Sequence, residues 1–388
     1  MRKLYIILII LLTLLGIAYF IKQKYSINPP IKLKDIPEDS LSVKAAALKV
    51  PEGFKVEIFA RNIKDARSMC LSPSHTLFVG NRDGDKIYAL RDEDNDNIAE
   101  KVYIVYKGGN MPNGVAFKDG ALYVAEVNRI LKFENIEDSL DLSPKPVVIF
   151  DQYPTDKWHG WKYIAFGPDG KLYIPVGVPC NICEEKNPLY GTMTRMNPDG
   201  TDMEIIHNGI RNTVGFTWHP DTKNLWFTDN GRDDFGDDRP NCELNHAFKD
   251  NLHFGFPYCH EGDIPDPKFG IGKNCDDYIK PVAKMGPHVA PLGIEFIRNN
   301  YLPDAFNNQF YIAKHGSWNR KEKIGYEIDR VKVDASGNLI EKSTFISGWL
   351  SDDKKDVWGR PVDIELWKDG SILISDDYAN CIYRVAKI

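Results

Sequence analysis

Short apolar runs, each closed by a tight turn, recur along the chain after residue 50. They are rich in Val, Ile, Tyr and Phe, they have the length of strands, and many end in Asp-Gly or a related turn pair. No long stretch in this region keeps the apolar period of a helix. The pattern therefore predicts an all-β protein.

The runs also resemble one another, which indicates an internal repeat. Each unit reads as strand, turn, strand and usually a third strand. The units lie at 68–90, 114–133, 163–200, 215–231, 292–333 and 362–385. A spacing of roughly 45 to 80 residues suits the blades of a β-propeller. We expect a six-bladed β-propeller over residues 50–388, closed by a lone strand at 53–62 that joins the last blade and leaves no open sheet edge.

The N-terminus has a different pattern. An apolar run at 4–21 is flanked by Arg2, Lys3, Lys22 and Lys24. Its length is near the roughly 18 residues at which a membrane-spanning helix becomes plausible, which favours an uncleaved anchor over a cleaved signal peptide. We expect a signal peptide or membrane anchor at 1–25 and a linker at 26–49. Either reading predicts an exported protein, periplasmic or otherwise extracytoplasmic, attached to the membrane only if the segment stays uncleaved.

Charge and cysteine content narrow the choice further. The net charge of −6 provides no basic field for phosphates, so nucleic acid is not expected as a partner. The seven cysteines include the pair Cys180 and Cys183. This spacing fits a redox or zinc half-site, but a local disulfide or structural turn is favoured because neither a βαβ pattern nor a second CxxC accompanies it. The odd number leaves at least one thiol free if all pairing is internal.

The register of the repeats gathers polar side chains at one end of the expected channel. His159 and Arg211 each stand about ten positions before the turn of their own repeat unit. Asn212 and Arg360 stand one residue later in the same register. Arg67 and Asn113 fall near the same end. Arginine offers paired donors for carboxylates, and histidine can act as a general base near neutral pH. The alternative is that each residue caps its own blade.

Two acidic stretches are candidate metal sites. Residues 227–245 contain five aspartates, which either bind a hard cation such as Ca²⁺ or pair with Arg232 and Arg239 in a solvated loop. Gly231 would let the backbone approach a ligand closely. Residues 92–96 resemble the start of a calcium loop, but Asn97 replaces the expected glycine and Tyr103 the twelfth-position glutamate. We interpret them as an acidic turn with weak affinity for a structural ion.

The stretch YIAKHGSWNR at 311–320 crowds donors around one flat aromatic side chain. It contains Lys314, His315, Trp318 and Asn319. Such a strand end is typical of a wall for a planar or sugar ligand. A single tryptophan is more often part of a core, but Trp318 has polar neighbours.

Several ordered motifs resemble one known family. The segments FGPDGKLYIPVG with PCNIC, GIRNTVGFTWHP, LWFTDNGRDDFGDD, HVAPLGIEF, KHGSWNR and WGRPVDI resemble the soluble, quinone-dependent glucose/sorbosone dehydrogenases, in particular the sorbosone dehydrogenase-like branch. The resemblance runs from about residue 50 to the C-terminus. It implies a six-bladed propeller that binds pyrroloquinoline quinone (PQQ) and Ca²⁺ at one mouth and oxidises a sugar hydroxyl or aldehyde.

The resemblance also implies roles for single residues. His159 matches the base that takes the hydroxyl proton, and the Arg211–Asn212 pair matches the residues that stabilise charge on the cofactor. The main-chain carbonyls of Gly231 and Arg232 match those that hold Ca²⁺. Lys314 and Arg360 match the residues that grip the cofactor carboxylates. By their place in the repeats and in the stretch 311–320, we expect Arg67, His315, Trp318 and Asn319 to bind the cofactor as well. Trp158 before His159, and Cys242 before the Glu of ELN, depart from the glucose-oxidising branch and leave the sugar open.

Three functions compete at this stage. The first is a quinone-dependent sugar dehydrogenase with a sugar substrate and an external electron acceptor. The second is a calcium-dependent propeller lactonase or other hydrolase, which would need several acidic side chains at the starts of inner strands. The third is a non-catalytic, carbohydrate-binding propeller, which has no need of a basic clamp.

Overall fold

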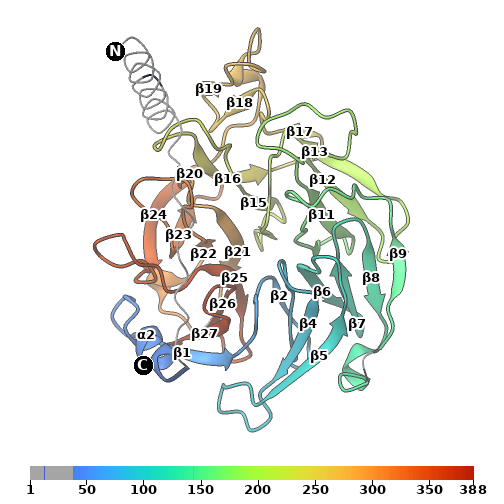
Figure 1. The fold of residues 1–388 in the computed structure, drawn as a ribbon, viewed down its shortest axis with the longest axis vertical. Helices are drawn as coiled ribbons and strands as arrows, with labels where there is room; N and C mark the ends of the chain where they lie inside the picture. Colours follow the sequence, from blue (N-terminus) through green and yellow to red (C-terminus); the bar gives the residue numbers. More distant parts are fainter. Residues whose placement is uncertain (1–12, 14–37, 143, 300) are drawn as a thin grey trace, which may run out of the picture.

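Six sheets, each with four antiparallel strands, are arranged around a central axis in the computed structural model (Figure 1). The structure describes residue 13 and residues 38–142, 144–299 and 301–388. Each sheet is one blade, and consecutive blades follow the chain around the ring. The predicted all-β, six-bladed propeller is confirmed.

Each blade contains four strands in antiparallel order, innermost strand first. Blade 1 contains β2 (Met69–Leu71), β3 (Leu77–Val79), β4 (Lys86–Arg91) and β5 (Lys101–Lys107). Blade 2 contains β6 (Gly114–Lys118), β7 (Ala121–Ala125), β8 (Ile130–Phe133) and β9 (Val147–Phe150). Blade 3 contains β10 (Ala165–Phe166), β11 (Leu172–Val176), β12 (Thr192–Met196) and β13 (Glu204–Asn208). Blades 4 and 5 are β14 (Phe216–Trp218), β15 (Leu225–Asp229), β16 (Asn241–Ala247) and β20 (Ala283–Pro287); and β21 (Pro291–Ile297), β22 (Gln309–Lys314), β23 (Glu327–Val333) and β24 (Leu339–Ile346). Blade 6 is β25 (Pro361–Leu366), β26 (Ile372–Asp376), β27 (Cys381–Lys387) and β1 (Phe54–Arg61). The 3-10 helices are η1 (Ile136–Asp138), η2 (Cys275–Asp277) and η3 (Asp304–Phe306).

The ring closes through the N-terminal strand. Strand β1 pairs antiparallel with β27, from Phe54 opposite Lys387 to Arg61 opposite Cys381. The first described strand of the chain thus becomes the outer strand of the last blade, as the sequence predicts. Because β1 and β27 pair in one sheet, the hydrogen bonds between them tie the start of the propeller to its end.

Inner strands approach one another closely around the channel, and glycine makes this possible. A Cβ atom at Gly215 would lie 2.1 Å from the carbonyl oxygen of Leu292, and one at Gly293 would lie 2.3 Å from Asp363 Oδ1. Both distances are well inside van der Waals contact, so larger residues would force blades 4, 5 and 6 apart at the axis.

Apolar side chains fill the spaces between neighbouring blades. Trp226 on β15 is buried and lies with its ring 4.6 Å from that of Phe310 on β22. Phe310 in turn meets Phe296 edge-on at 4.8 Å. The Trp226–Phe310 contact joins blade 4 to blade 5, whereas the Phe310–Phe296 contact lies within blade 5. Burial of large aromatic side chains is the main term that holds such layers together.

The segment before the propeller is partly structured. Helix α2 (Glu38–Ala46) lies within the expected linker 26–49 and buries Leu41 and Ala45 against the core beside Phe54. The expected signal or anchor at 1–25 lies outside the described residues, apart from Thr13. Among the residues that are described, no helix combines the length and apolar character needed to span a membrane.

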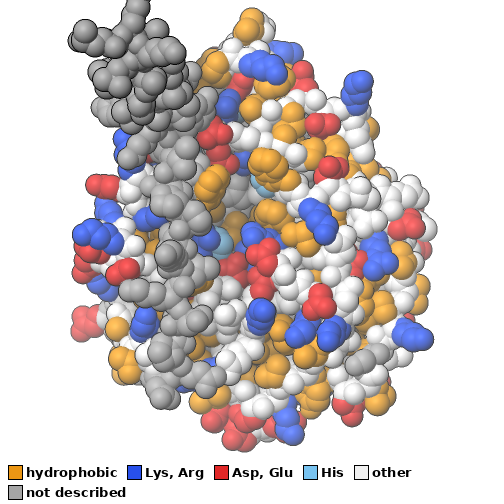
Figure 2. Space-filling view, in the orientation of Figure 1, with side chains coloured by type: hydrophobic (Ala, Val, Ile, Leu, Met, Phe, Trp, Pro, Cys, Tyr) orange, Lys and Arg blue, Asp and Glu red, His pale blue; other side chains and the backbone are white. Residues whose placement is uncertain are grey.

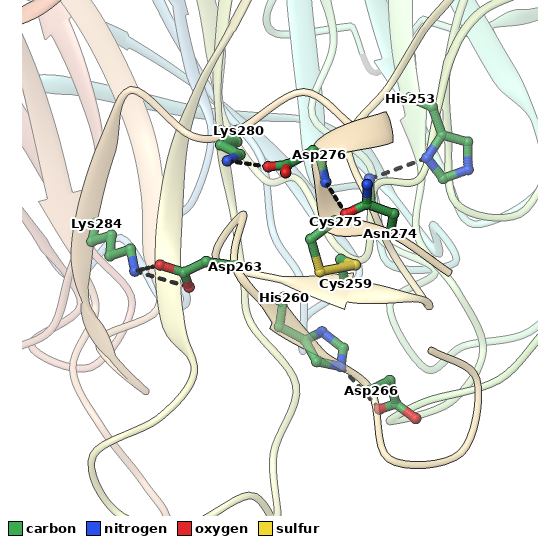
Figure 3. The surroundings of a disulfide bond; sticks show 11 residues. His253, Cys259, His260, Asp263, Asp266, Asn274, Cys275, Asp276, Lys280 and Lys284 are labelled. Carbon is green, nitrogen blue, oxygen red and sulfur yellow. Dashed lines mark hydrogen bonds and ion pairs between the residues drawn. A yellow bond between two sulfur atoms is a disulfide. The ribbon is translucent and has the colours of Figure 1, made fainter. Parts of the chain in front are cut away.

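An insertion between β16 and β20 stands out from the ring. It contains β17 (Leu252–His253), which adds to the outer edge of blade 3, and the short hairpin of β18 (Cys259–His260) and β19 (Ile264–Pro265). A disulfide joins Cys259 to Cys275, and His260 contacts Asp266 at 2.9 Å (Figure 3). The second disulfide joins Cys180 to Cys183, which confirms the expected local pair.

Acidic side chains on the inner strands predict a pH-dependent stability. Burial, and then the charge of Asp363, raise the pKa of Glu295 on β21 to about 8. An unfolded glutamate titrates near 4.3, so between these values the native state binds more protons and stability falls as pH rises. We expect Glu295→Gln to reduce the loss of melting temperature between about pH 5 and pH 8. An exposed control, Glu341→Gln, should keep the wild-type slope, and an unchanged slope in Glu295→Gln would refute the assignment.

Candidate functional site

A polar cavity of about 310 Å³ opens at one mouth of the channel. Its volume lies at the lower end of the range common for ligand pockets. Figure 2 shows histidine and basic side chains inside a hollow near the centre of this face. The lining residues are Arg67, Arg82, His159, Trp161, Arg211, Asn212, Asn230, Gly231, Asp233, Cys242, His288, Ala290, Leu292, His315, Trp318 and Arg360.

The structure brings most of the predicted site residues together here. His159 precedes β10, Arg211 and Asn212 precede β14, and Arg360 directly precedes β25. Arg67 lies just before β2, and Asn113 accepts a hydrogen bond from its Nε at 3.1 Å. The starts of the inner strands thus meet at one mouth, as the repeat register predicts.

His159 is held as a neutral imidazole. Its Nδ1 lies 2.8 Å from the carbonyl oxygen of Val178, which fixes Nδ1 as the protonated nitrogen. Burial, and then the nearby charge of Arg211, lower the pKa of His159 to about 3. Nε2 is therefore the nitrogen with the free electron pair. The indole of Trp158, which is 56% exposed, donates its Nε1–H to this nitrogen at 3.0 Å.

Arg211 and Asn212 are anchored through their backbone. The carboxylate of Asp229, at the end of β15, accepts both backbone N–H groups, at 2.8 Å from Arg211 and 2.6 Å from Asn212. Burial raises the pKa of Asp229 to about 6, while these two hydrogen bonds oppose the rise. Asp229 thus acts as scaffolding for the cavity wall.

A second anchoring group lies on the opposite side of the cavity. Asp377 accepts hydrogen bonds from Arg67 at 2.8 Å and from His315 Nε2 at 2.8 Å. Burial alone would raise the pKa of Asp377, but His315, Arg67 and Arg360 together hold it well below its ordinary value. The guanidinium of Arg360 donates to the carbonyl oxygens of His315 at 3.0 Å and Gly316 at 2.9 Å. These contacts hold Arg67 and Arg360 in the cavity wall.

Positive charge dominates the lining. Four arginines, Arg67, Arg82, Arg211 and Arg360, face one lining carboxylate, Asp233, among the described residues of the wall. Arg82 stacks over the Trp161 ring with 4.8 Å between guanidinium carbon and ring centroid. The cavity is therefore suited to an anionic ligand.

Arg82 and Asp377 are among the residues of the site that the sequence analysis did not single out, as are Trp161 and His288 of the cavity wall. Arg82 follows β3, and Asp377 directly follows β26. Both stand at the ends of second strands, which run antiparallel to the inner strands and so end at the mouth where the inner strands begin. Superposing the repeats at the ends of their second strands, as well as at the starts of their first strands, would have found both residues.

Three predicted residues do not line the cavity. Lys314 is buried and pairs with Glu327 at 2.8 Å and Asp329 at 2.6 Å, both on the neighbouring strand β23. Asn319 donates to Asp233 at 2.8 Å from behind the wall. Arg232 pairs with Asp266 of the insertion at 2.5 Å and lines a separate small pocket of about 20 Å³ that also reaches Gly231.

The acidic loop after β15 is mostly scaffolding. One alternative was that its aspartates pair with Arg232 and Arg239. Instead, Arg232 pairs with Asp266, and Arg239 donates a hydrogen bond to the carbonyl of Phe235. Asp238 instead pairs with Arg320 at 3.0 Å. Long-range packing between blades 4 and 5 makes Arg320 the partner, which the local sequence does not reveal. Of the backbone groups expected to bind Ca²⁺, that of Gly231 belongs to the cavity wall.

The turn at 92–96 has the expected acidic cluster. One carboxylate oxygen from each of Asp92, Asp94, Asp96 and Glu100 lies within 4.8 Å of the others. Lys368 already contacts Asp92 at 2.7 Å. The Lys368 ammonium group therefore neutralises part of the negative charge of the acidic turn.

Two buried polar atoms in residues of the cavity wall bear on the kind of ligand that would fit. Asn212 Oδ1 and Trp161 Nε1 are buried without a hydrogen-bond partner in the described part of the chain. Both belong to residues of the wall. A buried polar atom without a partner is costly. In PQQ a carboxylate or quinone oxygen could accept from Trp161 Nε1–H, the pyrrole N–H could donate to Asn212 Oδ1, and the three carboxylates would supply counter-charge for the arginines. The residues present therefore fit this cofactor.

Comparisons with known proteins agree with the fold. A protein from Borreliella burgdorferi, described as uncharacterized, is 34% identical over 356 residues, which cover 88% of this chain and 91% of that protein. The calcium structure of a Trichoderma reesei protein of Carbohydrate-Active Enzymes Family AA12 has a TM-score of 0.76 at 18% identity, covering 89% of this chain and 98% of that chain. The holo form of the pyranose dehydrogenase PQQ domain from Coprinopsis cinerea has a TM-score of 0.74 at 16% identity, covering 92% and 98%. The model of the TrAA12-like family matches residues 48–387, and the chain therefore belongs to the TrAA12-like family.

Proposed function

We propose that this protein is a PQQ- and Ca²⁺-dependent dehydrogenase that oxidises an aldose or related sugar. The observation that carries the proposal is the meeting of a neutral histidine with four arginines in one cavity. A base and an anion-binding wall are both required for this reaction. The four lining arginines provide such a wall, although Arg67 also pairs with Asp377, Arg82 with Asp83 and Arg211 with Asp233.

The chain's own residues provide the binding site. Arg67, Arg82 and Arg360 lie where they can bind the cofactor carboxylates, each as a charge-assisted donor. Arg211 and Asn212 face the cavity from the opposite wall and stabilise negative charge on the cofactor oxygens. His315 and Trp318 complete the wall, and Asn319 supports it through Asp233.

His159 is the catalytic base in this proposal. When bound together with Ca²⁺, PQQ would supply the hydride acceptor. His159 Nε2 takes the proton of the sugar hydroxyl, and the Nδ1–H bond to Val178 keeps the ring oriented while the charge develops. The hydroxyl must replace Trp158 at Nε2, and the exposure of that indole leaves it room to move.

The proposed Ca²⁺ site uses main-chain carbonyls of Gly231 and Arg232. Carbonyl oxygens are suitable ligands for this hard cation. Asp266 pairs with the Arg232 guanidinium at 2.5 Å. This ion pair would neutralise the charge of the Arg232 side chain near a Ca²⁺ ion bound by its carbonyl.

The substrate and setting follow from the sequence resemblance. We propose a sugar of the sorbosone or glucose type, an external electron acceptor, and an exported protein, periplasmic or held at the membrane by residues 4–21. The two disulfides support an oxidising compartment. A metal-dependent lactonase receives less support, because Asp233 is the one carboxylate among the described residues of the cavity wall.

Reconstitution tests the proposal directly. The purified apo protein is titrated with PQQ in the presence and absence of Ca²⁺, and binding is followed by the absorbance of the quinone. Dye reduction is then measured with a panel of aldoses, and lactone hydrolysis is measured in parallel. We expect Ca²⁺-dependent PQQ binding and dye reduction with at least one sugar. A protein that neither binds PQQ nor reduces dye would refute the proposal, and lactone hydrolysis would favour the hydrolase.

A further inference from the structure

One loop contacts both the proposed base and the proposed charge-stabilising arginine. This loop runs from Val178 to Cys183, after the end of β11, and is cross-linked by the Cys180–Cys183 disulfide. The carbonyl of Val178 binds His159 at 2.8 Å, and its N–H donates to the carbonyl of Arg211 at 3.0 Å. The loop therefore joins the start of blade 3 to the start of blade 4.

Asn181 lies between the two cysteines and holds the Arg211 guanidinium. Its carbonyl oxygen accepts from Arg211 Nε at 2.9 Å, and its side-chain Oδ1 accepts from an Nη of the same guanidinium at 3.0 Å. Two adjacent donors on one edge of a planar group are thus bound by one residue. The other Nη donates to the carbonyl of Asn230 at 3.2 Å. These contacts fix the orientation of the guanidinium plane.

The same side chain also holds the backbone after β15. Asn181 Oδ1 accepts the N–H of Asp233 at 2.8 Å, and its Nδ2 donates to the carbonyl of Asp233 at 3.0 Å. Both backbone groups of Asp233 are therefore bound by one amide. Because Asp233 lines the cavity, as Gly231 does, Asn181 couples the position of Arg211 to that of the wall.

The disulfide explains how a loop residue can have this role. Residues 177–191 connect β11 to β12 without forming a named strand or helix. A loop of this length loses substantial conformational entropy when one side chain is fixed. A cross-link that encloses Asn181 reduces the freedom of its backbone before Arg211 is bound.

We propose that Asn181, held in the Cys180–Cys183 loop, is a positioning residue that aligns Arg211 and the 231–233 backbone for the cofactor. The inference rests on the proposed function only for what the aligned wall binds. The alignment itself is a property of the protein without cofactor. It assigns a role to the CxxC pair that is neither metal binding nor thiol chemistry.

The test compares Asn181→Ala and the double variant Cys180→Ser/Cys183→Ser with the wild type. Asn338→Ala, which removes a side-chain contact in a remote surface turn, serves as the matched control. In the apo proteins, Arg211 is probed with phenylglyoxal, an arginine-specific reagent, and modification is followed by peptide mass spectrometry. PQQ affinity is measured on the same samples.

We expect Arg211 to react at least about tenfold faster in both Asn181→Ala and the double serine variant, with PQQ affinity about tenfold weaker or more. Asn338→Ala should match the wild type. Asn181→Asp keeps an acceptor for the guanidinium and should retain much of the protection of Arg211. If Asn181→Ala does not fold, the double serine variant and Asn181→Asp decide the question alone.

Unchanged Arg211 reactivity in folded Asn181→Ala or in the double serine variant would overturn the proposal. A fall in melting temperature with unchanged Arg211 reactivity would do the same, because it shows a purely structural loop. Failure of the wild type to bind PQQ refutes the proposed function, yet the phenylglyoxal comparison still decides the positioning role.

Discussion

Replacing His159 by alanine should lower sugar oxidation by about 10²- to 10⁴-fold while changing PQQ affinity little, because general-base catalysis contributes a factor of this size. The imidazole lines the cavity with Nε2 as its proton acceptor, and the four arginines proposed to bind the cofactor stay in place. Turnover is measured by dye reduction with PQQ-saturated protein. Affinity is measured separately by quinone titration.

The acid side of the pH profile provides an independent check of the same role. Since burial and Arg211 lower the pKa of His159 to about 3, the ring stays neutral over the whole range in which an ordinary histidine becomes charged. Turnover should therefore stay constant as pH falls from 7 to about 5. His75→Asn, at an exposed histidine of the blade 1 hairpin, is the control and should behave like the wild type. Equal loss of PQQ binding and turnover in His159→Ala would contradict the role of base.

Replacing Arg360 by methionine should weaken PQQ binding by about 10- to 100-fold, which corresponds to one or two lost charge-assisted hydrogen bonds. Methionine keeps much of the apolar stem but lacks the donors. The effect is expected at the cavity because Arg360 lines it and is held there by the carbonyls of His315 and Gly316. Quinone titration of the apo variant measures the change.

The loss of those two carbonyl contacts also lowers stability, so affinity must be compared at a temperature where the variant is folded. Arg330→Met is the matched control, because Arg330 lies on β23 and pairs with Glu341 at 3.1 Å, away from the cavity. It should leave PQQ affinity unchanged. A folded Arg360→Met with wild-type affinity would show that Arg360 does not bind the cofactor.

Much of the site could be predicted because the fold repeats. In a propeller, equivalent positions of different blades lie around one axis, so a shared register places His159, Arg211 and Arg360 together without any knowledge of packing. The same argument places Arg67 at the mouth. The closing strand 53–62 was predictable for a related reason. A lone strand before the first blade would leave an open sheet edge unless it pairs with the last blade.

Other features depended on contacts between distant parts of the chain. Lys314 ends a strand at the mouth, yet its side chain turns to Glu327 and Asp329 on β23 and leaves the cavity. Arg320, and not a neighbour in the acidic loop, pairs with Asp238. Which carboxylate meets which cation is set by packing and burial, and local sequence contains no signal for it.

From the sequence by itself follow the all-β class, the six blades, the order in which they close, and the end of the channel at which polar residues gather, because each depends on periodicity and register alone. Only the tertiary structure decided that Arg82 and Asp377 belong to the site, that Asp229 supports the wall, and that Asn181 holds Arg211. These assignments depend on the directions of side chains and on hydrogen bonds over contacts of a few ångströms between different blades and loops. Repeat spacing determines where a residue stands, whereas packing determines what its side chain touches.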